Sequence, residues 1–214
     1  FAYLETGTIT ITVTVRPGAN PALYNNMAIA TATSIAGTNV TDSSQDGTDV
    51  DPNNNDDPTD DNDPTPIPIP AIALLKTLTS SVLQPSGDVR LTFDFMVHNI
   101  GNVSLASIIL EDDLVFDAAL SSTPDISVSV MNINANQIPS ANTNYDGVTD
   151  IELITGASNL SPGQKFRVTL SVDVNPILFS QLNSSLQVNQ GIVYGTPVDP
   201  LGQVLINPTT GVLY

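Results

Sequence analysis

The chain has 214 residues, a formal net charge of −17 and no cysteine. This balance argues against nucleic acid as a partner, because a protein poor in lysine and arginine releases few phosphate counterions. The lack of cysteine excludes disulfides, thiolate metal sites and thiol nucleophiles. No apolar run reaches the roughly 18 residues of a membrane span, so we expect no direct membrane insertion.

The N-terminal stretch alternates between apolar residues and threonine. Residues 8–15 read TITITVTV, which predicts a half-buried antiparallel strand with Ile9 and Ile11 on its apolar face. A second, weaker alternation includes Met27 and Ile29. We interpret residues 1–41 as the C-terminal part of a β-sandwich module.

An acidic linker follows at 42–70, with nine aspartates between Asp42 and Asp63. Oxygen-bearing side chains recur there at the spacing of a calcium loop, and Asn54 takes the place usually held by glycine because it tolerates a left-handed backbone. Further aspartates on either side would complete the shell. The predicted Ca²⁺ ligands are Asp42, Asp46, Asp49, Asp51, Asn53, Asn55, Asp57, Asp60, Asp61 and Asp63. The alternative is a solvated, disordered acidic linker.

The linker ends in PTPIPIP, residues 64–70. A proline at every second position holds the backbone extended, which predicts a rigid spacer. Ile67 and Ile69 are expected to seat against the module that follows. A polyproline ligand for a partner domain is the alternative interpretation.

Residues 71–214 contain strand patterns at short intervals. Val89 to Val97 alternate in phase, as do Phe166 to Val174, and glycine-containing turns separate the candidate strands. About seven strands without a sustained helical period predict an antiparallel β-sandwich. One short helical turn is possible in the segment that begins VNPILF.

The chain also contains an internal repeat. Residues 4–15 resemble residues 160–172: each has a leucine, a gap, a glycine and then an alternating strand. Such repetition is typical of module arrays, so we expect the native protein to extend upstream.

The second module resembles a family of bacterial Ig-like surface repeats known as domain of unknown function eleven. The resemblance is carried by Gly87-Asp88 before an alternating strand, by the Asn99 to Asn102 turn (NIGN), by Asp112-Asp113 at a strand end, and by LSPGQKFRVTLSVDV. It covers about 71–199 and part of 1–42. It implies tandem modules in large secreted or cell-surface proteins and no enzymatic activity, although fold likeness alone does not establish function.

Other residues offer weaker signals for chemistry. His98 is the sole histidine, so a polar strand-end role is favoured over a metal or triad role. Glu111, Asp112 and Asp113 are interpreted as a solvated strand end, with an acid pair or cation ligands as alternatives. A further alternative is an internal Lys–Asn cross-link of the kind seen in bacterial surface proteins, formed by Lys76, an asparagine such as Asn189 and a buried glutamate such as Glu152.

Together these features predict an all-β chain: tandem Ig-like antiparallel β-sandwiches, at 1–41 and 71–214, joined by an Asp/Asn/Pro-rich linker at 42–70. The expected function is a structural stalk or filament segment of a large bacterial cell-surface protein, with calcium stiffening the linker and neighbouring modules as partners. Two alternatives stay open. One is an adhesin module that binds glycan or protein through the loop at 131–149. The other is a self-assembling fibre in which a neighbour adds strands to the N-terminal module.

Overall fold

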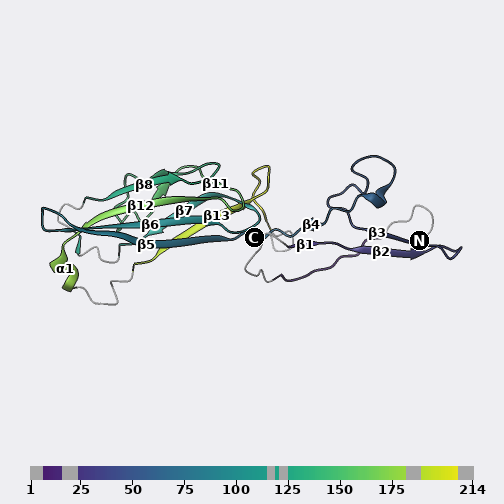
Figure 1. Ribbon diagram of the computed structural model, residues 1–214, viewed down its shortest axis with the longest axis horizontal. Coiled ribbons are helices and arrows are strands. Elements are labelled where there is room, and N and C mark those ends of the chain that lie inside the picture. The colour runs from purple at the N-terminus through teal and green to yellow at the C-terminus, as the bar shows by residue number, and fades with distance from the viewer. Residues whose placement is uncertain (1–6, 16–23, 115–118, 121–124, 182–188, 207–214) are drawn as a thin grey trace.

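The computed structural model of the chain describes residues 7–15, 24–114, 119–120, 125–181 and 189–206. Within these ranges the regular secondary structure consists almost entirely of antiparallel strands. Figure 1 shows a β-sandwich with a narrower N-terminal region extending from one end of it. The all-β part of the predicted fold class is confirmed. No helix in the described ranges is long and apolar enough to span a membrane.

Two facing sheets form the sandwich. The larger has four strands, in the order β5 (Ile72–Leu83), β6 (Val89–Asn99), β12 (Lys165–Val174) and β8 (Ser127–Asn132). The smaller has three, in the order β11 (Asn159–Leu160), β7 (Ser104–Asp112) and β13 (Gly191–Val198). A further short pair joins β9 (Ser140–Ala141) and β10 (Ile154–Thr155).

The core lies between the sheets and follows the alternation in the sequence. β12 pairs with β6 in an unbroken register from Lys165 opposite His98 to Val174 opposite Val89. Successive side chains of a strand point to opposite faces, so every second residue enters the core. The fully buried core side chains include Phe95, Val97, Phe166, Val168, Leu170 and Val172. The predicted inward faces of both strands are confirmed.

A short helix follows β12. Helix α1 (Pro176–Gln181) begins where Asn175 Oδ1 accepts hydrogen bonds from the backbone N–H groups of Ile177 and Leu178. Proline suits the first helical position, because its missing N–H would have no partner there. The predicted helical turn is confirmed.

The N-terminal region contains small, exposed strand pairs. β2 (Ile29–Thr33) and β3 (Asn39–Ser43) form a hairpin, and β1 (Asn25–Asn26) pairs with β4 (Thr65–Pro66) in the linker. Residues 7–15 belong to no strand, and their side chains are exposed. The prediction of a half-buried strand at 8–15 is therefore wrong, because no strand or sheet among the described residues covers this stretch. Residues 1–6 lie outside the described residues.

The proline-rich end of the linker is fixed to the sandwich by the turn between β6 and β7. Asn102 Oδ1 accepts from the N–H of Ile69 at 2.6 Å, and Asn102 Nδ2 donates to the carbonyl of Ile67 at 2.8 Å. Gly101 lies so close that a Cβ there would come within 2.4 Å of the Ile69 carbonyl oxygen. Ile69 is buried and Ile67 half-buried. The predicted seating of Ile67 and Ile69 is confirmed.

Candidate functional site

The acidic linker curls through a series of side-chain-to-backbone hydrogen bonds. Asp49 Oδ1 accepts from the N–H of Asp51, Asn53 Oδ1 from that of Asn55, and Asn55 Oδ1 from that of Asp57, at 2.8 to 3.1 Å. Such bonds between residues two apart are typical of Asn and Asp in tight turns. Asn54 adopts the predicted left-handed backbone, with φ of 56°.

The curled loop brings five of the predicted ligands together. The carboxylate of Asp51 accepts two backbone N–H groups, from Asn55 and Asp56, at 3.1 and 3.0 Å. Two amide groups then reach across the loop to carboxylates from its other side. Asn53 Nδ2 donates to Asp61 Oδ1 at 3.0 Å, and Asn55 Nδ2 donates to Asp60 Oδ2 at 2.9 Å.

The other predicted ligands lie apart from this cluster or serve the backbone. Asp42 is exposed on β3, and Asp46 is exposed in the loop that follows. Asp57 caps the short 3₁₀ helix η2 (Pro58–Asp60), and its bonds to Thr59 lower the pKa of its carboxyl. The N–H of Asp63 donates to Gln45 Oε1, which ties the two ends of the loop together. Asp49 lies beside the cluster through its bond to Asp51.

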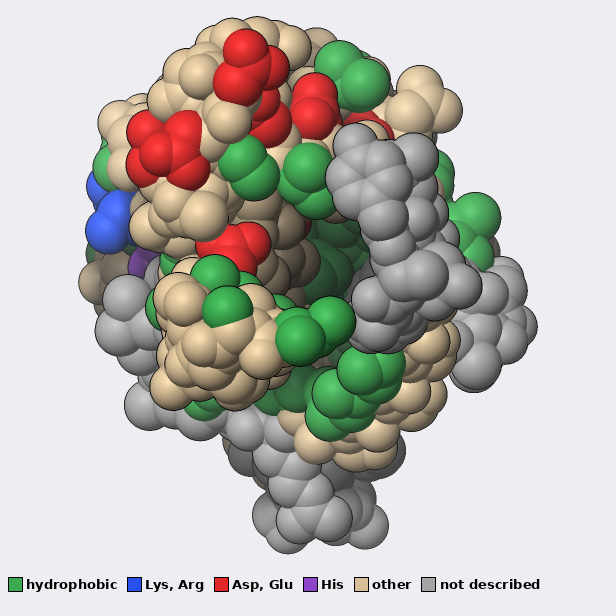
Figure 2. Space-filling model, turned by 90° about the vertical axis from the view of Figure 1, so that its right-hand side faces the viewer, with side chains coloured by type: hydrophobic (Ala, Val, Ile, Leu, Met, Phe, Trp, Pro, Cys, Tyr) green, Lys and Arg blue, Asp and Glu red, His purple; other side chains and the backbone are tan. Residues whose placement is uncertain are grey.

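Like charge concentrates around Asp61. Burial raises the pKa of the Asp61 carboxyl, and the neighbouring carboxylates of Asp60, Asp51 and Asp49 raise it further. The Oδ2 atom of Asp61 is shielded from solvent and has no hydrogen-bond partner. Figure 2, which views the molecule from the N-terminal end of Figure 1, shows acidic side chains gathered on the upper side of that end.

The residues of this loop fit a hard cation in their chemistry. All the side-chain atoms able to bind an ion here are oxygens, which suits Ca²⁺, and a cation would give Asp61 Oδ2 the partner it lacks. The described residues contain no group of three or more acidic or histidine side chains already gathered around one point to hold a metal. The amide nitrogen of Asn53, which lies 3.5 Å from Asp60 and 3.0 Å from Asp61, stands between their carboxylates instead.

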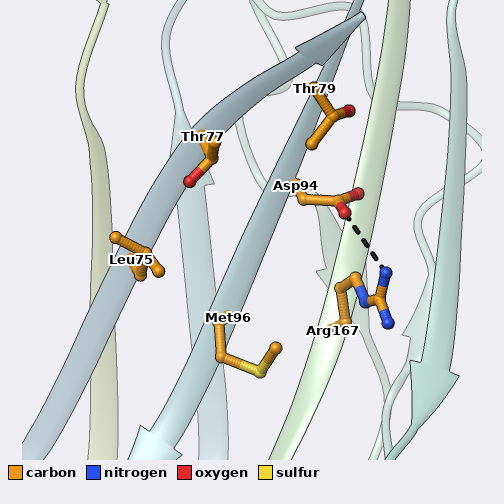
Figure 3. Close-up of a pocket in the computed structure, with 6 residues that line it drawn as sticks. All are labelled: Leu75, Thr77, Thr79, Asp94, Met96 and Arg167. Atoms are coloured by element: carbon orange, nitrogen blue, oxygen red, sulfur yellow. Dashed lines mark hydrogen bonds and ion pairs between the residues drawn. The ribbon is translucent and has the colours of Figure 1, made fainter.

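A shallow hollow lies on the outer face of the four-stranded sheet. Figure 3 shows Asp94 pointing toward Arg167, with which it pairs at 3.3 Å; Thr169 also donates to Asp94, at 2.6 Å. The side chains that line the hollow are Leu75, Thr77, Thr79, Asp94, Met96 and Arg167. Half-buried His98 lies on the same strand, opposite Lys165. The Asp94 carboxylate is therefore engaged by its neighbours rather than free for a ligand.

The proposed cross-linking residues are brought together only in part. Lys76 and Asn189 both contact the carboxylate of Asp112, whereas Glu152 is exposed. The sequence reading of Asp112 as part of a solvated strand end is wrong, because its side chain is fully buried. The missed signal is the alternation of β7: Ile108 and Leu110 face the core, so the next residue but one, Asp112, faces it too.

Comparison of the chain with family models, with curated proteins and with solved structures gives no match. The resemblance to bacterial Ig-like surface repeats therefore rests on the sequence motifs alone.

Proposed function

We propose that this chain is a structural segment of a large bacterial cell-surface protein, a stalk or filament unit that holds its length and direction. The single observation that carries the proposal is the joint at Asn102, where the linker is bonded directly to the β6–β7 turn of the sandwich. A flexible tether between independent domains has no need of such a joint.

The joint fixes the path of the linker where it meets the sandwich. Ile69 both donates to the Asn102 side chain and accepts from the Asn102 backbone N–H, at 2.6 and 3.1 Å. The N–H groups of Ile100 and Gly101 donate to the carbonyl of Ala71. Prolines at every second position from Pro64 to Pro70 restrict the backbone between these contacts. Together they favour one direction of the linker over many.

Calcium is proposed as the ion that stiffens the acidic loop. Asp49, Asp51, Asn53, Asn55, Asp60 and Asp61 would hold it, and it would neutralise part of the charge that now surrounds Asp61. Binding would also order the loop, because separated carboxylates repel one another until a cation joins them.

The remaining parts of the proposal rest on composition and resemblance. We infer an extracellular location on the bacterial surface, neighbouring modules of the same protein as partners, and no enzymatic role. The sandwich reaches a closed core without any disulfide, as the cysteine-free sequence requires.

Calcium titration of the full chain tests the proposal. We expect Ca²⁺ to bind and to raise the melting temperature of the protein. It should also narrow the distribution of interatomic distances measured by small-angle X-ray scattering. A chelator should reverse these effects. The paired variant Asp51→Asn with Asp61→Asn should lose binding, whereas Glu152→Gln, which removes an exposed carboxylate of the sandwich, should keep it. Identical scattering and melting with calcium and with chelator would refute calcium stiffening.

A second candidate function, assembly into fibres, is favoured by the uncovered N-terminal stretch. Ile9, Ile11 and Val13 are 89%, 78% and 69% exposed, and none of the residues that the structure describes forms a strand pair with 7–15. A strand from another copy could pair with this stretch and cover its apolar face. Sedimentation over a range of concentrations tests this idea: it requires assembly that Ile11→Lys abolishes, and a chain that stays monomeric at high concentration rules it out.

No comparable observation favours the adhesin alternative. Polar side chains of the loop at 131–149 bond within the sandwich: Asn142 donates to Asp150, and Asp146 accepts from the backbone of Val148 and Thr149.

A further inference from the structure

A lysine, an aspartate and an asparagine meet inside the sandwich, between its first and last strands. Lys76 Nζ lies 2.6 Å from Asp112 Oδ1. Asn189 Nδ2 donates to the other oxygen of the same carboxylate, Oδ2, at 3.3 Å. One carboxylate therefore holds an amine on one side and a carboxamide on the other.

The fold brings these three side chains together from distant parts of the chain. On β5, Lys76 continues the face of Ile72 and Leu74, which pack against the core. Asp112 ends β7, and the register of β13 begins with Gly191 opposite Asp112, so the chain just before β13 must pass beside this carboxylate. A Cβ at Gly191 would lie 3.0 Å from the ring of Phe95, so the chain passes close to the core at this point.

Burial disfavours charge on both ionisable groups, since Asp112 is fully buried and the Lys76 side chain is only 14% exposed. The rings of Phe93 and Phe95, whose centres lie 5.0 Å from Lys76 Nζ, act in the opposite direction on the amine, because a ring face attracts a cation. Burial lowers the pKa of Lys76 and raises the pKa of Asp112, and their mutual attraction opposes both shifts. The pair is thereby shifted toward a neutral amine and a neutral acid.

An ordinary structural role leaves this arrangement poorly explained. A buried ion pair gains little net stability over apolar residues of similar size, since two charges must leave water. Here the carboxylate also accepts from an asparagine whose carbonyl oxygen, Oδ1, is buried and has no hydrogen-bond partner. That oxygen is part of an electrophilic carboxamide, which is hydrogen-bonded to the same carboxylate as the desolvated amine.

We propose that Lys76 and Asn189 join in an intramolecular isopeptide bond, with Asp112 as the acid–base group. Asp112 first takes a proton from the Lys76 ammonium. The neutral Nζ then forms a bond to Asn189 Cγ, and the bond from Cγ to Nδ2 breaks. The products are a secondary amide and ammonia. The neutral amine loses one proton as it becomes the amide nitrogen, and the leaving nitrogen gains one proton to become ammonia. The reaction consumes no oxidant or co-reactant.

Asp112 has two tasks in this reaction. As a neutral acid it donates a hydrogen bond to Asn189 Oδ1 after the carboxamide rotates to present that oxygen. This bond stabilises the negative charge that develops on the oxygen. As a carboxylate it receives the proton that Nζ loses and passes it to the leaving nitrogen. Two backbone contacts hold Asp112 in position: its N–H donates to the carbonyl of Ile151, and its own carbonyl accepts from the hydroxyl of Tyr145 at 2.9 Å.

The bond would give the sandwich a covalent tie between its two sheets. β5 and β13 are edge strands of different sheets, and they lie side by side near Ile72 and Gly195. A pull on the two ends of the chain would pass directly from Lys76 to Asn189. The chain between them would then carry no tension and could not be drawn out.

Mass spectrometry of the intact, folded chain tests the proposal directly. We expect a mass below the sequence mass by one ammonia, and a proteolytic peptide in which the Lys76 and Asn189 segments are joined. The joined peptide separates this reaction from cyclisation of an asparagine, which also releases ammonia but links no second segment. A folded chain that keeps its full sequence mass after prolonged incubation would overturn the proposal.

Variants locate the bond and its catalyst. Lys76→Arg and Asn189→Ala should restore the full mass expected for each variant, and Asp112→Ala should do the same while leaving both bond-forming residues in place. Lys165→Arg, which changes the only other lysine, should keep the ammonia deficit. A deficit that survives Lys76→Arg, or one that disappears in Lys165→Arg, would assign the bond elsewhere.

Discussion

The sandwich and the N-terminal stretch use the same sequence pattern with opposite results. On β12, Phe166, Val168 and Leu170 alternate with polar residues and are completely buried. At the N-terminus, Ile9 and Ile11 alternate with threonine just as regularly, yet they are 89% and 78% exposed. The difference is that β12 lies between two hydrogen-bonded strands and under a second sheet, whereas no strand or sheet in the described part of the chain pairs with residues 7–15 or covers them.

This contrast separates two properties that are often inferred together from an alternating pattern: which side chains share a face, and whether that face is buried. Period-two alternation determines which side chains share a face, because successive residues point to opposite sides of a strand. Burial of that face depends on a partner surface, which a local pattern does not contain. The sandwich supplies that surface from within the same chain, and a covalent tie between Lys76 and Asn189 would make it permanent.

The largest expected effect comes from removing the proposed bond. This variant tests whether a covalent bond holds the sandwich together. Asn189→Ala should lower the free energy of unfolding by about 4 to 5 kcal/mol, because a cross-link across a loop of about 100 residues restricts the unfolded chain to that extent. This corresponds to a fall of about 15 °C in melting temperature. Lys165→Arg is the control, and equal melting of Asn189→Ala and the unaltered chain would contradict the bond.

A pair of truncations tests burial itself. Phe166→Ala should destabilise the protein by about 3 to 5 kcal/mol, since it leaves a cavity in a fully buried site. Ile11→Ala, in the same sequence pattern, should change stability by less than about 0.5 kcal/mol because its side chain has little to lose. Denaturant unfolding measures both; a large effect of Ile11→Ala would mean that the N-terminal stretch is covered in solution.

The joint between the two regions gives a smaller effect. Asn102→Ala removes the acceptor for the buried N–H of Ile69 and the donor to Ile67, which should cost about 1 to 3 kcal/mol. Hydrogen exchange at the Ile69 amide should accelerate. Asn102→Asp, which keeps only the acceptor, should protect that amide better than alanine does. Unchanged exchange in Asn102→Ala would show that the linker is held by other contacts.

Acid sensitivity within the sandwich provides the smallest effect. The carboxylate of Asp146 accepts from the Thr149 hydroxyl and from three backbone N–H groups, which hold its pKa well below the usual 3.8. The stabilisation is therefore present above the unfolded pKa and lost as pH falls toward the lower folded pKa. Asp146→Asn should melt lower at neutral pH and lose less stability on acidification than Glu152→Gln. Parallel acid profiles would contradict this role.

Several features of the fold could be predicted from the sequence because they are local. The alternation of β6 and β12, the helix at Pro176 and the left-handed Asn54 all follow from neighbouring residues. The seating of Ile69 followed from proline spacing next to an apolar residue. The sequence did not predict which surface each element packs against. Residues 7–15 illustrate this, because their alternation was interpreted as a half-buried strand and their side chains are exposed.

The proposed cross-linking site could also be predicted only in part from the sequence. Lys76 and Asn189 could be named from their places near the first and last strands, but the carboxylate between them could not be found by residue type. Glu152 was the wrong choice because it is exposed, while Asp112 lies in phase with the buried Ile108 and Leu110. Strand parity would have selected it. The pairing of β13 with β7, which brings Asn189 to it, depends on contacts distant in the sequence.

Force measurement on single molecules tests most directly whether the chain is built to hold its length. The full chain is pulled from its two ends at increasing force. We predict that the segment between Lys76 and Asn189 adds no length, and that Asn189→Ala releases it. An unaltered chain whose sandwich extends by roughly 400 Å, the contour length of more than 100 residues, would contradict the account.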